Sequence, residues 1–240
     1  MIPADRSPSP QPAGLIAGIL PPVVAAVESI ADAPRVGGLF PAEEAAVRTA
    51  GPCRRAEFTA GRLCARAAMA LLGAPATAIL PGPAGQPQWP KGMTGSITHC
   101  AGYQASAVAL TTDVAAIGID AEPDLRLPAG LIEMVAAPPE QASIRQAAAM
   151  GPAVCWDRLL FSAKESVAKL WYPLTGQWLG FHDVAIRPAI TGTFDVCLPP
   201  HAGPGPDDWP RSQMTGRWLA RDGLIVTAIT WTPLTRTRWQ

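Results

Sequence analysis

The most regular pattern of apolar and polar positions covers residues 156–173, WDRLLFSAKESVAKLWYP, where no glycine or internal proline interrupts a helix. Read at 3.6 residues per turn, Phe161, Glu165 and Lys169 fall on one stripe, beside apolar positions. The pattern predicts a central helix that begins near residue 152. Two interpretations stay open: Glu165 and Lys169 form an ordinary pair on a solvated face, worth about 0.2–0.5 kcal/mol, or they belong to a functional site.

A second amphipathic helix is predicted from Arg54 to Leu72, with Gly73 as its C-cap. Arg62 and Arg66 are four residues apart and therefore share a face, where both guanidinium groups could reach the same anion. Two arginines on a helix are more often only a solvated flank. The spacing thus indicates a candidate anion site and does not decide it.

Shorter patterns predict strands, small helices and loops around these two helices. The clearest is a hairpin whose strands, 216–220 and 224–231, are joined by the turn Arg-Asp-Gly. The other expectations are a buried strand within 15–30 leading to a short element, a helix start at 40–44, strands at 104–110, 115–120, 181–186 and 193–198, helices near 130–136 and 139–150, and loops at 74–95 and 199–213.

The order of these elements predicts the fold class. Because each part of the chain offers helices and a few antiparallel strands, we predict an α+β fold of two similar halves rather than a doubly wound sheet. We expect a disordered segment at residues 1–14, an N-terminal half at 15–115 and a C-terminal half at 116–240. No short-period repeat is visible.

Residues 95–99, GSITH, are interpreted as a small-residue turn that presents a hydroxyl, backbone N–H groups and an imidazole together. A serine and a histidine three residues apart, Ser96 and His99, do not make a catalytic triad, and no third member is evident. A lone histidine is more often a hydrogen-bonded structural residue than a catalyst. The segment therefore offers polar groups without a defined reaction.

Two carboxylates mark the end of the strand predicted at 115–120. Asp120 and Glu122 alternate onto the same side of an extended chain, about 7 Å apart, where they repel each other unless a cation lies between them. Ligands made only of oxygen indicate Mg²⁺ or Mn²⁺ rather than Zn²⁺. The alternative is a strand end that passes into a polar loop.

Composition narrows the class of protein. With 240 residues, 48% hydrophobic, 16% charged and a formal net charge of zero, the chain is a globular protein with no global field to attract nucleic acid or an anionic membrane. Five cysteines without a CxxC pair indicate free thiols in a reducing cytoplasm. The apolar run at 15–30 is interrupted by glycine, prolines and glutamate, so it is neither a signal peptide nor a membrane span.

Four segments resemble, in order and spacing, the Sfp-type 4′-phosphopantetheinyl transferases, and most closely their actinobacterial members. The likeness covers roughly residues 40–235. The segments are RRAEFTAGRLCAR at 54–66, WPKG at 89–92 leading to GSITH at 95–99, GIDAE at 118–122 and FSAKES at 161–166 with Lys169.

This resemblance implies two pseudo-symmetric α+β halves with coenzyme A in the cleft between them. It implies transfer of the 4′-phosphopantetheine arm of coenzyme A to a serine of an acyl or peptidyl carrier protein, with release of adenosine 3′,5′-bisphosphate. A cytoplasmic monomer is expected, without nucleic acid or membrane partners. Two other functions stay open: a non-catalytic binding module for coenzyme A or carrier protein, and a Mg²⁺-dependent phosphohydrolase.

The resemblance also implies roles for individual residues. Asp120 and Glu122 hold Mg²⁺ on the pyrophosphate, and Glu165 is a third metal ligand, the general base toward the carrier serine, or both. Lys169 contacts a pyrophosphate oxygen. The other residues expected to bind coenzyme A are Arg54, Arg62, Arg66 and His99 around the phosphates and adenosine end, Ser96 on the phosphates, and Trp178 against the pantetheine arm.

Two positions depart from the family pattern. Pro81 stands where many relatives have a basic residue, which removes one expected phosphate contact. Ala168 stands where many have an aromatic residue, which widens the wall beside the pantetheine arm.

Overall fold

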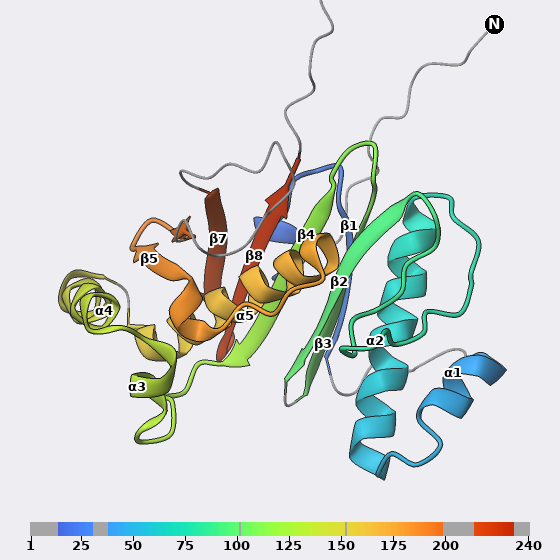
Figure 1. The fold of residues 1–240 in the computed structure, drawn as a ribbon, viewed down its shortest axis with the longest axis horizontal. Helices are drawn as coiled ribbons and strands as arrows, with labels where there is room; N and C mark the ends of the chain where they lie inside the picture. The colour runs from blue at the N-terminus through green and yellow to red at the C-terminus, as the bar shows by residue number, and fades with distance from the viewer. Residues whose placement is uncertain (1–13, 31–37, 101, 152, 199–213, 233–240) are drawn as a thin grey trace, which may run out of the picture.

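The computed structural model describes residues 14–30, 38–100, 102–151, 153–198 and 214–232 (Figure 1). These residues form two antiparallel sheets, with strand orders β1-β3-β2 and β4-β8-β7-β6-β5. The expected disordered segment lies outside the described residues except for Gly14, and so does the predicted loop 199–213. No helix in the described part of the chain combines the length and apolar character that a membrane span needs.

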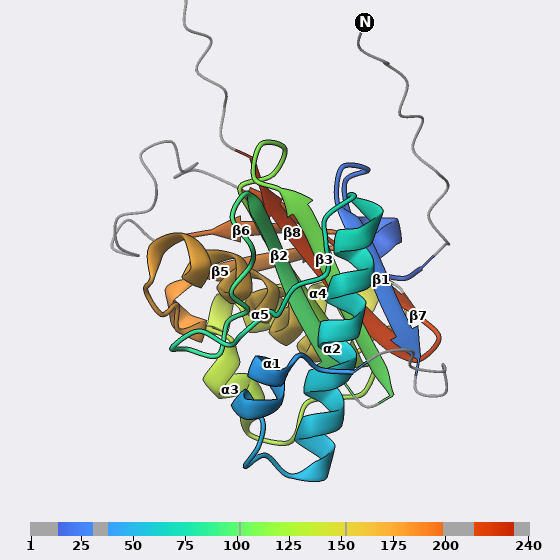
Figure 2. The same cartoon turned by 90° about the vertical axis from the view of Figure 1, so that its right-hand side faces the viewer.

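In the N-terminal half a long helix, α2, lies across the sheet β1-β3-β2 (Figures 1 and 2). The face of α2 that carries small side chains, including Ala65 and Ala68, packs with Val108 of the sheet in one buried cluster. The helix was predicted from Arg54 and begins slightly earlier. The elements are η1 (Ala17–Ile19), β1 (Ala25–Ile30), α1 (Pro41–Ala46), α2 (Pro52–Leu71), β2 (Met93–Cys100) and β3 (Tyr103–Leu110).

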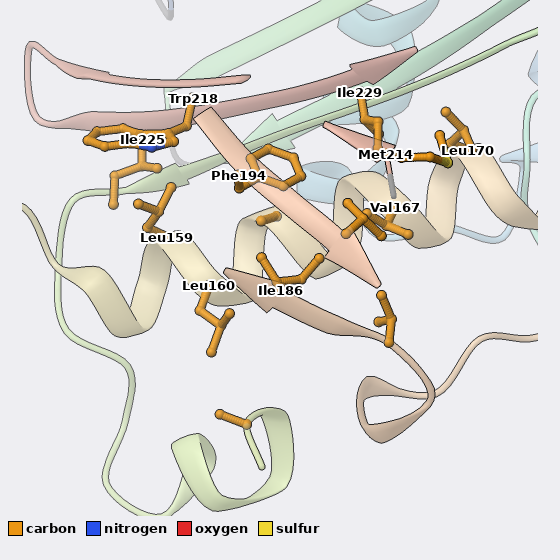
Figure 3. Packing of buried hydrophobic residues seen from close by; sticks show 14 of the residues in the cluster. Leu159, Leu160, Val167, Leu170, Ile186, Phe194, Met214, Trp218, Ile225 and Ile229 are labelled. Atoms are coloured by element: carbon orange, nitrogen blue, oxygen red, sulfur yellow. The ribbon is translucent and has the colours of Figure 1, made fainter. Parts of the chain in front are cut away.

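In the C-terminal half the predicted central helix, α5, is present and packs on the five-stranded sheet, although it begins at Trp156 rather than near residue 152. Leu160, Val167 and Leu170 of this helix belong to the same buried cluster as Phe194 and Ile229 (Figure 3). The elements are β4 (Ala116–Pro123), α3 (Leu131–Val135), α4 (Pro138–Met150), α5 (Trp156–Thr175), η2 (Phe181–Asp183), β5 (Ala185–Ala189), β6 (Thr193–Cys197), β7 (Met214–Arg221) and β8 (Leu224–Trp231).

Gly118 permits a close approach of β4 and α5. A Cβ atom at this position would lie 1.8 Å from the carbonyl oxygen of Ser166 and 3.0 Å from Cβ of Leu170. Any side chain here would therefore push the helix away from the strand. The close packing lets a lysine of α5 reach an aspartate of β4, as described below.

The two sheets meet where β2 and β4 lie side by side (Figure 1). The strands belong to different sheets, and side chains join them. The hydroxyl of Ser96 accepts a hydrogen bond from the Ile119 N–H at 3.2 Å, and that of Thr98 accepts one from the Ala121 N–H at 3.1 Å. Hydroxyl groups of one half thus satisfy backbone donors of the other.

A buried carboxylate anchors the start of α1 in the N-terminal half. Glu43 accepts hydrogen bonds of 2.9 Å from the backbone N–H groups of Phe40 and Ile79. Both of its oxygens lie 2.9 Å from Nη1 of Arg66 on α2. Nη2 of Arg66 donates to the carbonyl oxygen of Gly38 at 2.7 Å. The anchor ties α1 and α2 to the connection that leads to β2.

The C-terminal half contains the same arrangement at the start of α4. Glu140 accepts hydrogen bonds from the backbone N–H groups of Ala137 at 3.0 Å and Ile186 at 2.8 Å. Nζ of Lys164 on α5 lies 2.8 Å from the carboxylate and donates to the Phe181 carbonyl oxygen at 2.6 Å. Each half therefore uses one buried carboxylate to join a short helix, a long helix and a later segment.

The two anchors belong to an internal repeat that the sequence interpretation missed. Residues 41–48 read PAEEAAVR and residues 138–145 read PPEQASIR. Both stretches begin a helix with proline in its first turn. The two similar halves predicted from the order of elements are confirmed, while the proposed division at residues 115 and 116 stays a prediction.

The prediction of a turn at residues 95–99 is wrong. These residues lie within β2, which pairs with β3 along its whole length. Glycine is needed for packing here, because a Cβ at Gly95 would lie 2.5 Å from the carbonyl oxygen of Ala107. Alternation along the strand then points Ser96 and Thr98 to the same side, toward β4.

Two strand predictions also need correction. The strand expected at 181–186 begins only at Ala185, because η2 comes first and Asp183 accepts a hydrogen bond from the Gly180 N–H at 2.8 Å. The strand expected within 15–30 begins at Ala25. The chain before it folds back onto β1, where Glu28 binds the N–H groups of residues 15 and 16 at 2.7 and 3.0 Å.

Candidate active site

Asp120 lies on β4 at the junction of the two sheets and is only 4% exposed. Its Oδ1 accepts hydrogen bonds from Lys169 Nζ at 2.6 Å and from the Thr98 hydroxyl at 3.1 Å. Its Oδ2 is buried and has no hydrogen-bond partner among the described residues. A buried carboxylate oxygen in this state is costly, so the site favours a cation or a donor at Oδ2.

Thr98 is the site residue that the sequence interpretation missed. Its hydroxyl donates to Asp120, accepts from the Ala121 N–H at 3.1 Å and lies 3.4 Å from Lys169 Nζ. The only signal in the sequence was its position two residues after Ser96, which places both hydroxyls on one face of a strand. Thr98 therefore holds the Asp120 carboxylate against the neighbouring half.

Glu165 lies one helical turn before Lys169 on α5, as the stripe in the sequence predicted. Burial raises the pKa of Glu165 above the ordinary carboxyl value, Lys169 opposes the shift, and Asp120 adds to it. No hydrogen bond engages its carboxylate among the described residues. A carboxylate with a raised pKa is a stronger proton acceptor than an exposed carboxylate.

Glu122 follows Asp120 on β4, and its carboxylate pairs with Nη1 of Arg158 at 2.9 Å. Burial raises the pKa of Glu122, Asp120 raises it further, and Arg158 opposes both. Within the described part of the chain, no three histidine, cysteine or acidic side chains converge into a ready-made metal cage. The expected ligands Asp120, Glu122 and Glu165 thus share a region without forming a closed cluster.

The donors nevertheless fit a hard divalent cation. Asp120 offers an unpartnered buried oxygen, and the neighbouring acidic groups supply only oxygen. Mg²⁺ accepts such a set because it retains waters and takes further oxygens from a phosphate ligand. These residues would supply part of the coordination of Mg²⁺ or Mn²⁺ and leave the rest to water or phosphate oxygens.

A pocket of about 240 Å³ opens beside Lys169, between segments of both halves. Trp178 at its edge is 76% exposed, with its ring centroid 5.5 Å from that of Tyr172. Ala168 contributes the smallest side chain of the helical wall. The pocket is lined by residues 84–87 and 95–97 on one side and by Glu165, Ala168, Lys169, Tyr172, Pro173 and Trp178 on the other.

Arg54 and His99 lie together at the end of β2. Arg54 Nη1 donates to His99 Nε2 at 3.0 Å, so this nitrogen accepts and the ring proton is on Nδ1, 3.8 Å from Glu57. Burial lowers the pKa of His99, Glu57 opposes the shift, and Arg54 and Lys169 reinforce it. The pair offers one exposed guanidinium and one neutral imidazole.

Arg62 and Arg66, the other two candidate arginines of α2, point into the N-terminal half. Arg62 donates to the Ile79 carbonyl oxygen at 3.0 Å, and its guanidinium lies 3.8 Å from the centroid of the Phe58 ring. Burial lowers the pKa of Arg62 to about 10, against the opposing charge of Glu43. Arg66 is bound to Glu43 and is 9% exposed. The predicted shared face is present, but the anion on it is the protein's own Glu43.

The structure therefore does not bring Arg66 to the pocket, because its guanidinium is engaged inside the N-terminal half. Ser96 does line the pocket, although its hydroxyl is occupied by the backbone of β4. Pro81 forms a bridge with Pro87 in the connection between α2 and β2. Lys164, which the sequence placed beside Glu165, belongs to the buried anchor with Glu140.

Comparison with known proteins agrees with the motifs. A model of the 4′-phosphopantetheinyl transferase N-terminal domain matches residues 42–109, and a model of the 4′-phosphopantetheinyl transferase superfamily matches residues 116–220. Each half of the chain therefore matches a part of the same family.

Three relatives are similar over 90% of the chain. The 4′-phosphopantetheinyl transferase Svp of Streptomyces mobaraensis is 48% identical, with 88% of its length covered. Npt of Nocardia iowensis and PptT of Mycobacterium tuberculosis, both 4′-phosphopantetheinyl transferases, are each 41% identical, with 99% and 97% of their lengths covered. Together with the matched models, this similarity shows that the chain belongs to the 4′-phosphopantetheinyl transferase superfamily.

Proposed function

We propose that Asp120, Glu122 and Glu165 hold a Mg²⁺ at the junction of the two halves, and that Glu165 accepts the proton of the carrier serine. As a member of its family, the chain is an enzyme that transfers the phosphopantetheine of coenzyme A to carrier proteins. The observation that carries the site assignment is the unpartnered, buried Oδ2 of Asp120, whose other oxygen binds Lys169.

The chemistry requires little covalent work from the protein. The serine oxygen forms a bond to the β-phosphorus of coenzyme A, the bond from that phosphorus to the bridging oxygen breaks, and adenosine 3′,5′-bisphosphate leaves. Positioning and charge neutralisation supply most of the rate in such transfers. A bound Mg²⁺ neutralises negative charge on the pyrophosphate oxygens, and Mn²⁺ suits the same ligands.

Lys169 contributes a second positive charge beside the carboxylates. Its side chain is 31% exposed and lines the pocket while its ammonium pairs with Asp120. An ammonium group has three donors, so it can contact a phosphate oxygen while keeping one bond to the protein. This arrangement supports a role for Lys169 in binding the pyrophosphate.

Glu165 is the candidate general base. A serine hydroxyl is a poor nucleophile at neutral pH and needs an acceptor for its proton within hydrogen-bond reach. The raised pKa of Glu165, which follows chiefly from its burial, brings its basicity closer to neutrality than that of an exposed carboxylate. Its place on the pocket wall supports this role.

The remaining roles concern coenzyme A and the carrier. The apolar part of the pocket beside Tyr172 and Trp178 suits the pantetheine arm, and Arg54 with His99 suits the phosphates or adenosine end. Arg62 and Ser96 also stay candidates for binding coenzyme A, although both are buried. We expect an acidic face of an acyl or peptidyl carrier protein to dock near exposed Arg54.

The test uses purified protein, coenzyme A, Mg²⁺ and an apo carrier protein, followed by mass spectrometry of the carrier. Transfer raises the carrier mass by about 340 Da, as expected for in-line transfer of the phosphopantetheinyl group. Addition of a chelator should stop the reaction, which tests the metal. Binding of coenzyme A without a mass gain would indicate a binding module, and release of free phosphopantetheine would indicate a phosphohydrolase.

A further inference from the structure

Arg158, in the first turn of α5, uses its whole guanidinium to hold the chain that follows β4. Nη1 binds the Glu122 carboxylate at 2.9 Å, Nε donates to the Leu125 carbonyl oxygen at 2.9 Å, and Nη2 donates to the Arg126 carbonyl oxygen at 3.1 Å. All three nitrogens therefore contact one short segment, residues 122–126. The planar fork of arginine suits this kind of multiple contact.

Two more hydrogen bonds join the same segments. Asp157 accepts a hydrogen bond from the Leu127 N–H at 3.1 Å, and Asp124 accepts one from the Cys155 N–H at 2.8 Å. The start of α5 and the end of β4 are thus tied in both directions. Arg158 is the member of this set that reaches a carboxylate proposed to act in the site.

The contact matters because Glu122 lies at the end of a strand, where its long side chain would otherwise sample several rotamers. Arg158 removes this freedom and fixes one carboxylate oxygen, while leaving the other oxygen available. The same rigid helix carries Glu165 and Lys169. One helix therefore carries Glu165 and also holds the Glu122 carboxylate.

We infer that Arg158 is a positioning residue for the reaction, which fixes the Glu122 carboxylate and residues 122–126 so that Glu122 presents its second oxygen toward the cation site beside Asp120. The inference rests on the proposed metal site. Arg158 touches neither the pocket lining nor the Asp120 carboxylate in the described contacts, so it acts through Glu122.

The test compares Arg158→Met, which keeps an apolar stem but removes the donors, with Arg158→Lys, which keeps the charge without the fork. Calorimetric titration of coenzyme A at increasing Mg²⁺, with no carrier present, measures the Mg²⁺ concentration for half-maximal affinity. We expect Arg158→Met to raise this Mg²⁺ concentration about tenfold or more. Arg158→Lys should raise it nearly as much, because lysine lacks the fork. Arg126→Met is the matched control, since Arg158 binds the backbone carbonyl oxygen of Arg126, which this change keeps, and should change nothing.

A double-mutant cycle shows whether the effect passes through Glu122. If it does, Glu122→Gln and Arg158→Met combined should raise the Mg²⁺ requirement no more than Glu122→Gln alone. Additive effects would overturn the inference. A lower Mg²⁺ requirement in Arg158→Met would overturn it as well, because Arg158 would then be a competing cation.

Hydrogen exchange separates this inference from the metal assignment. In the absence of Mg²⁺ and coenzyme A, the peptide covering residues 122–130 should exchange faster in Arg158→Met than in the unmodified protein, while peptides of α2 should not change. If the unmodified protein shows no Mg²⁺-dependent coenzyme A affinity, the metal assignment fails, and unchanged exchange at 122–130 would overturn the positioning role separately.

Discussion

Asp120 of β4 and Lys169 of α5 form an ion pair of 2.6 Å across the junction between strand and helix. The pair is asymmetric, because Asp120 is buried while the Lys169 side chain is 31% exposed. The lysine can therefore move toward a phosphate, whereas the aspartate is held by Thr98 and the strand. This difference supports the proposal that Asp120 holds the metal and Lys169 contacts the substrate.

Removing the hydroxyl of Thr98 should weaken both the fold and the site. In Thr98→Val the Ala121 N–H and the Asp120 carboxylate each lose a partner, and a buried group left unsatisfied costs about 1–3 kcal/mol. Denaturant unfolding should show this loss, and carrier mass gain should show slower turnover. Thr94→Val, at a less buried position on the same strand, is the control. Turnover unchanged in Thr98→Val would mean that Thr98 does not orient Asp120.

Arg66 should prove structural. Arg66→Met leaves the buried Glu43 without its cation, and breaking a buried pair costs about 3–5 kcal/mol. Arg55→Met, which removes an exposed pair with Glu44, should cost less than about 1 kcal/mol. The measurement is the free energy of unfolding in denaturant. An Arg66→Met protein that is fully stable but has lost affinity for coenzyme A would restore Arg66 to the binding site.

The raised pKa of Glu165 predicts how stability and activity depend on pH. Folding disfavours the charged form of Glu165. Its contribution to the free energy of unfolding is therefore complete below the ordinary carboxyl pKa, and it is lost as the pH rises through the raised pKa of the folded state. Without metal at neutral pH, Glu165→Gln should therefore melt at a higher temperature than the unmodified protein. Turnover needs the ionised base, so it should fall once the pH is low enough to protonate Glu165. A lower melting temperature for Glu165→Gln at neutral pH would contradict this electrostatic account.

The sequence predicted those parts of the site that lie within single elements. The helical stripe placed Glu165 one turn before Lys169, and strand alternation placed Asp120 before Glu122. Thr98 could not be recognised, because its role depends on the contact between β2 and β4, which belong to different sheets. Patterns within one element do not report such contacts.

The same limit explains the errors on α2 and the missed repeat. Spacing showed that Arg62 and Arg66 share a face, but the anion beside them, Glu43, comes from a different helix. The repeat is short and diverged, and the cation of its anchor is arginine in one half and lysine, Lys164, in the other. The hydrogen bonds show that Glu43 and Glu140, which occupy the same position in the two short stretches, make equivalent contacts.

The measurement that tests the account most directly compares Asp120→Ala with Glu165→Gln in one Mg²⁺ buffer, using calorimetry for coenzyme A affinity and carrier mass gain for rate. Asp120→Ala should lose Mg²⁺-dependent affinity and turnover together, because its carboxylate is the proposed fixed ligand of the metal. Glu165→Gln should keep most of the affinity and lose ~10²-fold or more in turnover, the scale of a general base. If Glu165→Gln loses affinity as completely as Asp120→Ala, Glu165 is chiefly a metal ligand and the assignment of the base is contradicted.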